Sequence, residues 1–369
     1  MAAPDPEPWL RLIHAPRVGP VQTRELLARF GDAQRIRTAS RAELTAAGLK
    51  PETIEALSAD APPAGVERDR EWAAAAADRH LLTLADPRYP ARLAAIADPP
   101  PVLYVQGDPE VLAYPALAIV GTRHPTPAGE EIAHDFARHL AASGLVIVSG
   151  LALGIDGAAH EGALAAGGLT VAAAGTGLDR IYPARHQTLA RRIAAEGALV
   201  SELPVGTRPS RSAFPRRNRI LAGLCEGTLV VEAAVRSGSL ITARLALEQD
   251  RDVFAIPGSI HNPVARGCHQ LIRQGAKLVE TADDVLEELA PRLGERPHAP
   301  DAASAPQSAQ PPEDPEYARL YACLDWQPRG IDDLAARSGL GAGEVASMLL
   351  RLELEGQVRI APGGLYQRV

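Results

Sequence analysis

The sequence is poor in aromatic residues and has no long uninterrupted apolar run. Aromatic residues make up 4% of the 369 residues, whereas hydrophobic residues as a whole make up 46%. The core must therefore be built mainly from aliphatic side chains, and an aromatic residue in a polar stretch becomes a candidate for a functional role. Because no run of 18 uncharged apolar residues occurs, we expect no membrane contact. The N-terminus has no basic stretch followed by an apolar one, which predicts a cytoplasmic protein.

Cysteine is also scarce, and the familiar cofactor motifs are missing. The three cysteines, Cys225, Cys268 and Cys323, lie far apart and form no CxxC pair. They predict neither a disulfide nor a zinc site. The loop after the first strand expected in the main domain reads Gly121-Thr122-Arg123 instead of G-x-G-x-x-G, and the chain has no GxxxxGK[ST] phosphate loop. We therefore expect no nucleotide cofactor and no metal.

Positive charge is in the minority, yet it is concentrated in one segment. The net charge is −7, but five arginines fall within twelve residues at the start of an apolar helix: Arg208, Arg211, Arg216, Arg217 and Arg219. Phe214 and Asn218 lie among them. Basic groups with an interleaved aromatic suit a single-strand binder, because an aromatic face stacks on any base while arginines follow the backbone. A solvated arginine face at a helix start is the alternative that this segment alone leaves open.

Between residues 116 and 289 short apolar runs alternate with helical segments. This alternation predicts a mostly parallel sheet covered on both faces, an extended Rossmann-like, doubly wound α/β fold. The expected strands are Leu117–Val120, Leu145–Val148, Leu169–Ala174, Leu199–Ser201, Thr228–Val231, Val253–Ile256 and Lys277–Val279. Ligands of such sheets bind at the carboxyl ends of the strands.

The loops at those ends are rich in glycine and hydroxyl groups. Gly121-Thr122-Arg123 follows the first of these strands, Gly150 the second, and Ser237-Gly238-Ser239 the fifth. Glycine lets the backbone approach a ligand closely, and hydroxyl groups can donate to phosphate oxygens. Together with the arginine segment, these loops predict an extended anion-binding groove.

The remaining chain divides into smaller modules. The sequence of residues 1–65 predicts short helices of SAM or helix-hairpin-helix type and a linker. We favour a structural or protein-contact role for this module over DNA binding. Residues 66–290 form the Rossmann-like domain, and residues 291–316, rich in Pro, Ala, Ser and Gln, predict a disordered linker. Residues 317–369 predict a winged helix. Its third helix is not basic, so we favour a protein or dimer contact over reading of the DNA major groove.

Catalytic interpretations find little support in the residues. Asp156 and His160 lie four residues apart on an expected helix, which suits an acid–base pair or half a metal site. A capping aspartate and a packed, hydrogen-bonded histidine are the favoured interpretation. Glu232 ends an expected strand, where we expect it to position the arginines of the groove.

Several motifs, taken together and in order, resemble the DNA-processing protein A family (DprA, also called Smf). They cover roughly residues 80–290 and comprise Asp86–Pro90, Pro101–Tyr104, Val120–Arg123, Ser149–His160, Phe214–Ile220, Glu232–Ala243 and Gly267–Ile272. The resemblance implies a non-enzymatic protein without cofactors. Such a protein binds single-stranded DNA, forms homodimers through the Rossmann-like domain and loads RecA during natural transformation and recombination.

The resemblance also implies a set of DNA-contacting residues. Gly121, Thr122 and Arg123 match the family's phosphate-binding loop, with Arg123 ranked first. The other implied contacts are Gly150, Arg211, Phe214, Arg216, Arg217, Asn218, Ser237, Gly238 and Ser239. Arg185 is a candidate for the lysine that many members carry near the Tyr182-Pro183 turn.

A rival hypothesis comes from another class of protein. A Rossmann-like domain with these loops could bind a nucleoside monophosphate and hydrolyse its glycosidic bond, with Arg123 on the phosphate and Glu232 as the acid–base group. That hypothesis leaves the segment from Phe214 to Arg219 without a role.

Overall fold

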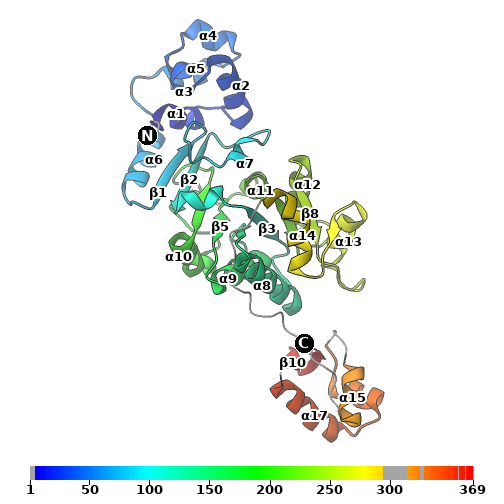
Figure 1. Cartoon of the computed structure of the whole chain (residues 1–369). Helices are drawn as coiled ribbons and strands as arrows, with labels where there is room; N and C mark the ends of the chain where they lie inside the picture. Colours follow the sequence, from blue (N-terminus) through cyan, green and yellow to red (C-terminus); the bar gives the residue numbers. More distant parts are fainter. Residues whose placement is uncertain (1–4, 294–313, 325–327, 356, 362, 369) are drawn as a thin grey trace. The chain divides into compact units, whose positions relative to one another are not determined.

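The computed structural model describes residues 5–293, 314–324, 328–355, 357–361 and 363–368 (Figure 1). The chain divides into two compact units, Met1–Pro300 and Asp301–Val369. The predicted disordered linker falls mostly outside the described residues. Its first residues instead end helix α14 (Ala282–Leu293), and its last residues begin helix α15 (Pro315–Cys323).

The first unit contains a nine-stranded sheet in the order β1-β2-β6-β5-β4-β3-β7-β8-β9. The strands are β1 (Arg79–Thr83), β2 (Val102–Gly107), β3 (Ala116–Val120), β4 (Val146–Ser149), β5 (Thr170–Ala173), β6 (Ala198–Ser201), β7 (Gly227–Val230), β8 (Asp252–Ala255) and β9 (Lys277–Leu278). The run from β6 to β9 is parallel, while β1 and β2 add two antiparallel pairings at one side. The predicted doubly wound, mostly parallel sheet is therefore confirmed.

Strand β3 shows why both faces of this sheet are covered. Leu117 and Ile119 lie in the core under α8 (Pro127–Ala142), α9 (Ile155–Ala165) and α14, whereas Ala118 and Val120 lie in the opposite core. Alternate residues of a strand point to opposite faces, so an unbroken apolar run needs helices on both sides. The opposite face is covered by α11 (Ala213–Leu224), α12 (Ser239–Glu248) and α13 (Arg266–Arg273).

Six helices precede the sheet. They are α1 (Glu7–His14), α2 (Pro20–Phe30), α3 (Ala33–Thr38), α4 (Arg41–Ala46), α5 (Pro51–Ser58) and α6 (Ala64–Ala74). Their apolar core is continuous with that of the sheet, because Trp9 and Trp72 belong to the same buried cluster as Tyr104 of β2 and Leu199 of β6. Further helices lie in the connections between strands: α7 (Ala91–Ala94), η1 (Pro109–Ala113), η2 (Ala184–His186) and α10 (Gln187–Glu196). The N-terminal helices therefore pack as part of the first unit.

The second unit is a small helical domain with a two-stranded wing. Helices α15, α16 (Ile331–Ser338) and α17 (Ala342–Leu354) precede the antiparallel strands β10 (Val358–Ala361) and β11 (Leu365–Arg368). Its core includes Leu320, Leu334 and Leu349, one from each helix. This arrangement confirms the predicted winged helix. Within the described parts of both units, no helix is long and apolar enough to cross a bilayer.

Candidate nucleic-acid interface

The loops that follow β3 and β7 meet the start of α11 around one open cavity of about 640 Å³, called the groove from here on. Ten of the twelve residues implied by the family resemblance line it: Gly121, Thr122, Arg123, Arg211, Phe214, Arg217, Asn218, Ser237, Gly238 and Ser239. The carboxyl ends of adjacent parallel strands meet at one edge of a sheet, which is why segments distant in sequence converge here.

An arginine and two aromatic rings form the wall of the groove. The Arg123 guanidinium lies 5.5 Å from the centre of the Phe214 ring, and the Phe214 and Tyr182 rings lie 5.5 Å apart and inclined by 42°. A Cβ at Gly175 would lie 2.7 Å from Phe214 Cδ1, so glycine is needed there for the ring to lie in this place. Tyr182 is 46% exposed. The wall therefore presents partly solvated aromatic surface beside a cation.

Tyr182 did not emerge from the sequence as a groove residue. It follows strand β5 and lines the groove. The signal that could have found it is the scarcity of aromatics, because a tyrosine in a polar turn after a core strand is unusual in a chain with 4% aromatic residues.

A serine turn at the start of α12 forms the other side of the groove. Ser237 Oγ and Ser239 Oγ lie 2.7 Å apart, and Asn218 Nδ2 donates to the Gly238 carbonyl at 3.3 Å. The amides of Ser239, Leu240 and Ile241 already donate within this turn, so its serine hydroxyl groups are what it presents to the groove. Asn218 therefore fixes a turn that places two hydroxyl groups at the groove.

The floor of the groove contains a buried arginine. Arg217 Nη1 donates to the Gly150 carbonyl at 2.7 Å and also to the Ala173 carbonyl. Burial lowers the pKa of Arg217 to about 10, and the carboxylate of Asp156 opposes that shift. A Cβ at Gly150 would lie 2.6 Å from both Arg217 Nη1 and Asp156 Oδ2. Gly150 is therefore the residue that allows this close packing, and it lines a smaller cavity beside the Phe214 wall.

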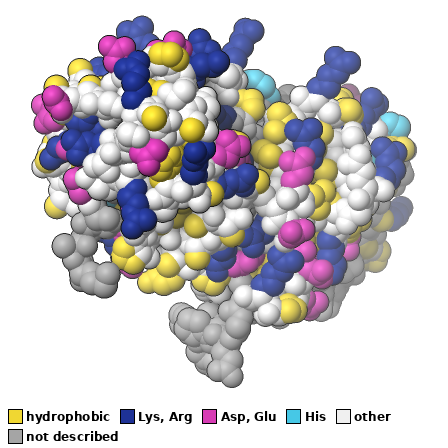
Figure 2. All heavy atoms as spheres, turned by 90° about the horizontal axis from the view of Figure 1, so that it is seen from above, with side chains coloured by type: hydrophobic (Ala, Val, Ile, Leu, Met, Phe, Trp, Pro, Cys, Tyr) yellow, Lys and Arg dark blue, Asp and Glu magenta, His cyan; other side chains and the backbone are white. Residues whose placement is uncertain are grey.

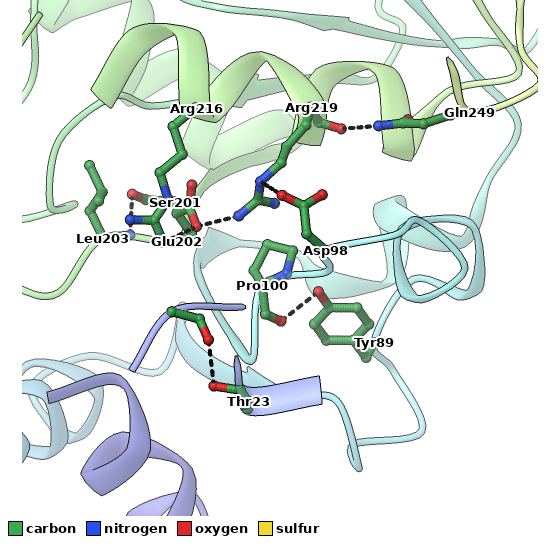
Figure 3. Close-up of polar contacts among 11 residues, drawn as sticks. Thr23, Tyr89, Asp98, Pro100, Ser201, Glu202, Leu203, Arg216, Arg219 and Gln249 are labelled. Atoms are coloured by element: carbon green, nitrogen blue, oxygen red, sulfur yellow. Dashed lines mark hydrogen bonds and ion pairs between the residues drawn. The ribbon is translucent and has the colours of Figure 1, made fainter. Parts of the chain in front are cut away.

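Arg216 and Arg219 point away from the groove. Arg216 Nη2 lies 2.9 Å from Glu202 Oε2, and Arg219 lies between that carboxylate and Asp98 (Figure 3). Burial raises the pKa of Glu202, and Arg219 and Arg216 oppose the rise. These two arginines therefore hold α11 to the segments that carry Asp98 and Glu202. Arg216 does not line the groove.

Arg185 is likewise apart from the groove. It lines a separate cavity of about 710 Å³ together with Glu130, Glu131 and Glu161. Carboxylates repel phosphate, so this cavity does not extend the chemistry of the groove.

Asp156 and His160 do not form a pair. Asp156 lies in the first turn of α9, and its Oδ2 accepts from the N–H groups of Gly150 and Ala152 in the preceding loop. The expected capping role is therefore wrong, because no side chain among the described residues caps α9 and Asp156 fixes the loop instead. His160 Nδ1 lies 2.7 Å from Thr170 Oγ1, and burial lowers the pKa of His160 to about 3. The ring is therefore neutral near pH 7. Among the described residues no group of three or more His, Cys, Asp or Glu side chains could hold a metal.

Glu232 does not position the arginines of the groove, which corrects the expectation from the sequence. Its Oε1 accepts from Thr126 Oγ1 at 2.7 Å, and its Oε2 accepts from Thr126 N at 2.9 Å. Asn262 Nδ2 is a third donor at 3.3 Å. Glu232 therefore fixes the N-terminus of α8, because Thr126 in turn caps that helix.

The fold and the groove together define a Rossmann-like protein whose strand-end loops form a groove lined by arginine, hydroxyl and aromatic side chains. Residues 80–290 match the family described as DNA recombination-mediator protein A, residues 303–364 match the DprA winged helix domain, and residues 5–38 match the DprA-like N-terminal HHH domain. The chain therefore belongs to the DprA family of DNA-processing proteins.

Relatives and solved structures agree with this assignment. Protein Smf of Escherichia coli is 44% identical over 288 residues, which is 78% of this chain and 77% of the relative. The X-ray structure of DprA from Streptococcus pneumoniae matches with a TM-score of 0.68 and 37% identity over 75% of this chain and 95% of that one. A structure of DNA processing protein A from Helicobacter pylori, which concerns its single-stranded DNA binding mode, has a TM-score of 0.53 and 32% identity. That match covers 58% of this chain and 96% of the other.

Proposed function

We propose that this protein binds single-stranded DNA in the groove, without regard to base sequence. The observation that carries the proposal is the meeting of exposed arginines, two aromatic rings and a serine turn around one open cavity. Membership of the DprA family supports it, as does the single-stranded DNA binding of the Helicobacter pylori relative.

Each part of the groove has a distinct task in this mechanism. Arg123 and Arg211 attract phosphates, and the Ser237–Ser239 turn donates hydrogen bonds to phosphate oxygens. Phe214 and Tyr182 stack on bases, and every base has a face that can make such a contact. Binding is therefore tolerant of sequence and weakened by salt, because each neutralised phosphate releases counterions.

We further propose a homodimer through the Rossmann-like domain, RecA loading and the absence of catalysis. Strand β9 is an edge strand of the sheet, and its Leu278 is 45% exposed. Ile260, in the loop after the neighbouring strand β8, is 73% exposed. Exposed apolar residues at a sheet edge are typical of an interface between copies. A dimer presents two grooves to one strand, which raises the effective affinity. Light scattering of the purified protein tests the dimer. RecA loading and a cytoplasmic location are supported by family membership alone.

The test of DNA binding is fluorescence anisotropy of a labelled oligo-dT strand at two salt concentrations, with unlabelled duplex as competitor. Arg211→Ala is compared with Arg216→Ala, because these arginines lie five residues apart and only Arg211 lines the groove. We expect Arg211→Ala to weaken binding and to reduce the slope of log K against log salt by about 0.7. Arg216→Ala leaves that slope unchanged. No binding at low salt, or equal effects of both variants, contradicts the proposal.

The nucleoside monophosphate hydrolase remains the alternative, and the contacts of Glu232 disfavour it. Both of its carboxylate oxygens already accept hydrogen bonds from Thr126, and Glu232 does not line the groove. A general acid must reach the leaving group of the substrate. Incubation with nucleoside monophosphates, followed by chromatography for released base, tests this alternative directly.

A further inference from the structure

An exposed arginine of the N-terminal helices lies against the loop that leads into the groove. Arg68 is on α6, and its Nη1 lies 4.0 Å from the position that a Cβ would take at Gly206. Gly206 has a φ of +92°, so the chain turns sharply there before it reaches Arg208 and Arg211. Two segments that are far apart in sequence therefore place basic side chains along one short path.

A buried carboxylate fixes this juxtaposition. Asp69, the residue after Arg68, is fully buried, and its Oδ1 accepts from the N–H of Val205 at 3.0 Å. Its Oδ2 accepts from the Tyr104 hydroxyl at 2.5 Å and lies 2.7 Å from His14 Nε2. A charge-assisted contact that is shielded from water resists local opening. Helix α6 and the turn at Gly206 are thus held together as one rigid piece.

The loop itself is pinned from its other side as well. The Gly206 N–H donates to Asp179 Oδ1 at 2.8 Å, and Thr207 Oγ1 donates to the Pro204 carbonyl at 2.6 Å. Asp179 is paired with Arg180 at 2.7 Å, so its charge is compensated locally. The path from the groove to α6 therefore has a fixed course.

The arginines along this path are not held by carboxylates of any described residue. Figure 2, which views the molecule from above, shows basic side chains scattered among acidic ones. Arg68, Arg208 and Arg211 are exposed, and within the described part of the chain they have no ion pair or side-chain hydrogen bond. The neighbouring Arg70 on the same helix is paired with Glu7 at 3.2 Å. Unpaired guanidinium groups keep their full capacity to bind phosphate.

We propose that the bound strand leaves the groove along the loop from Arg211 to Gly206 and continues onto α6, where Arg68 contacts its backbone. The N-terminal helices then supply part of the DNA-binding surface. This inference rests on the proposed function, because it extends the same single-stranded DNA beyond the groove. Glu67 and Glu71 are exposed acidic residues of the same helix, so the contact on α6 is limited to the Arg68 side chain.

The experiment compares two oligo-dT strands, one of about four nucleotides and one of about sixteen, with the wild-type protein and with single variants. For Arg68→Ala we expect unchanged affinity for the short strand. We also expect roughly three- to tenfold weaker binding of the long strand and a salt slope smaller by about 0.7. Arg68→Glu has a larger effect in the same direction. Arg70→Ala is the matched control and leaves both affinities unchanged.

Binding in the groove and the extension onto α6 can be disproved separately. If the wild-type protein binds neither strand at low salt, the proposed function is overturned together with this extension. If it binds both strands, and Arg68→Ala and Arg68→Glu bind the long strand as tightly as wild type, only the path over α6 is overturned. Because Arg68 is exposed, circular dichroism of each variant should match that of the wild-type protein.

Discussion

The groove and the winged-helix unit both contain arginines on or beside a helix, but they differ in what those arginines contact. Arg123 and Arg211 line the groove, and no ion pair holds either of them within the described residues. In the winged-helix unit, Arg329 and Arg337 both lie within 3.2 Å of Asp333, and Arg351 lies 3.0 Å from Glu355. Arg359 can donate to Gln367, and Arg368 lies over the Tyr321 ring.

This difference teaches that the number of arginines is a poor guide to nucleic-acid binding. An arginine held by a carboxylate has to give up that contact before it can bind phosphate, whereas an exposed, unpaired one does not. The same rule divides the arginine segment itself. Arg216, Arg217 and Arg219 are held by carboxylates or carbonyl groups of the fold, whereas Arg211 lines the groove without such a partner among the described residues.

The largest expected effect comes from removing the buried arginine of the groove floor. Arg217→Ala deletes the donor to two carbonyl groups and leaves the buried Asp156 without its nearest cation. We expect a loss of about 3–5 kcal/mol in the free energy of unfolding. Urea unfolding followed by circular dichroism measures it. Arg211→Ala is the control, and a similar stability for both variants would remove the distinction between structural and exposed arginines.

The next effect concerns DNA affinity. Arg123→Ala removes the cation above Phe214 and, with it, the charge-assisted phosphate contact that we propose. We expect binding of oligo-dT to weaken by about 1.5–3 kcal/mol, and Phe214→Ala to weaken it by about 1–3 kcal/mol through the lost stack. Anisotropy titrations give both values. Wild-type affinity in both variants, with the fold intact, would show that the groove is not the binding site.

A third prediction concerns the stability of the fold at acidic pH. Burial lowers the pKa of His160 to about 3, whereas an unfolded histidine titrates near 6.5. Between these values only the unfolded chain binds the proton, so stability falls as the pH drops through this window. We expect this residue to account for about 2 kcal/mol of lost unfolding free energy between pH 7 and pH 5.

The check is His160→Gln, which cannot titrate. Urea unfolding at pH 7 and pH 5 should show a smaller pH dependence in the variant than in the wild-type protein, whatever the variant's absolute stability. An identical pH dependence contradicts the prediction. The winged-helix unit has no histidine between residues 314 and 368, so this acid sensitivity belongs to the first unit.

The smallest effect is expected in the winged-helix unit. Arg351 on α17 is 67% exposed at its side chain, paired with Glu355 and placed 5.3 Å from the Tyr317 ring. Arg351→Ala should change the affinity for oligo-dT by less than about twofold, because the guanidinium of a paired surface arginine already contacts a carboxylate. Weakening comparable to that of Arg123→Ala would show that this unit also contacts the strand.

Much of the fold was predictable because the spacing of apolar residues and the positions of turn residues are local signals in the sequence. Unbroken apolar runs such as Leu117–Val120 indicate strands covered on both faces, and the winged helix follows from the spacing of its helices and the Pro362-Gly363-Gly364 turn. The groove loops were predictable for the same reason, since strand-end glycines and hydroxyls mark a binding edge in an α/β sheet.

The directions of side chains were not predictable. Arg216 and Arg217 are adjacent in sequence, yet one reaches Glu202 and the other is buried over Gly150. Neighbouring residues of a helix point about 100° apart, and only tertiary contacts decide which of them faces the ligand. The contact of Glu232 with Thr126 is equally invisible in sequence, because it joins positions 106 residues apart.

The continuous core beneath the N-terminal helices gives the protein an internal optical reporter. Of its three tryptophans, Trp9 and Trp72 are buried in that core, and Trp72 lies 5.9 Å from the Tyr104 ring. Tyr104 donates to Asp69, which also holds the turn at Val205. Indole emission from these two residues should therefore respond when that turn loosens, without any label on protein or DNA.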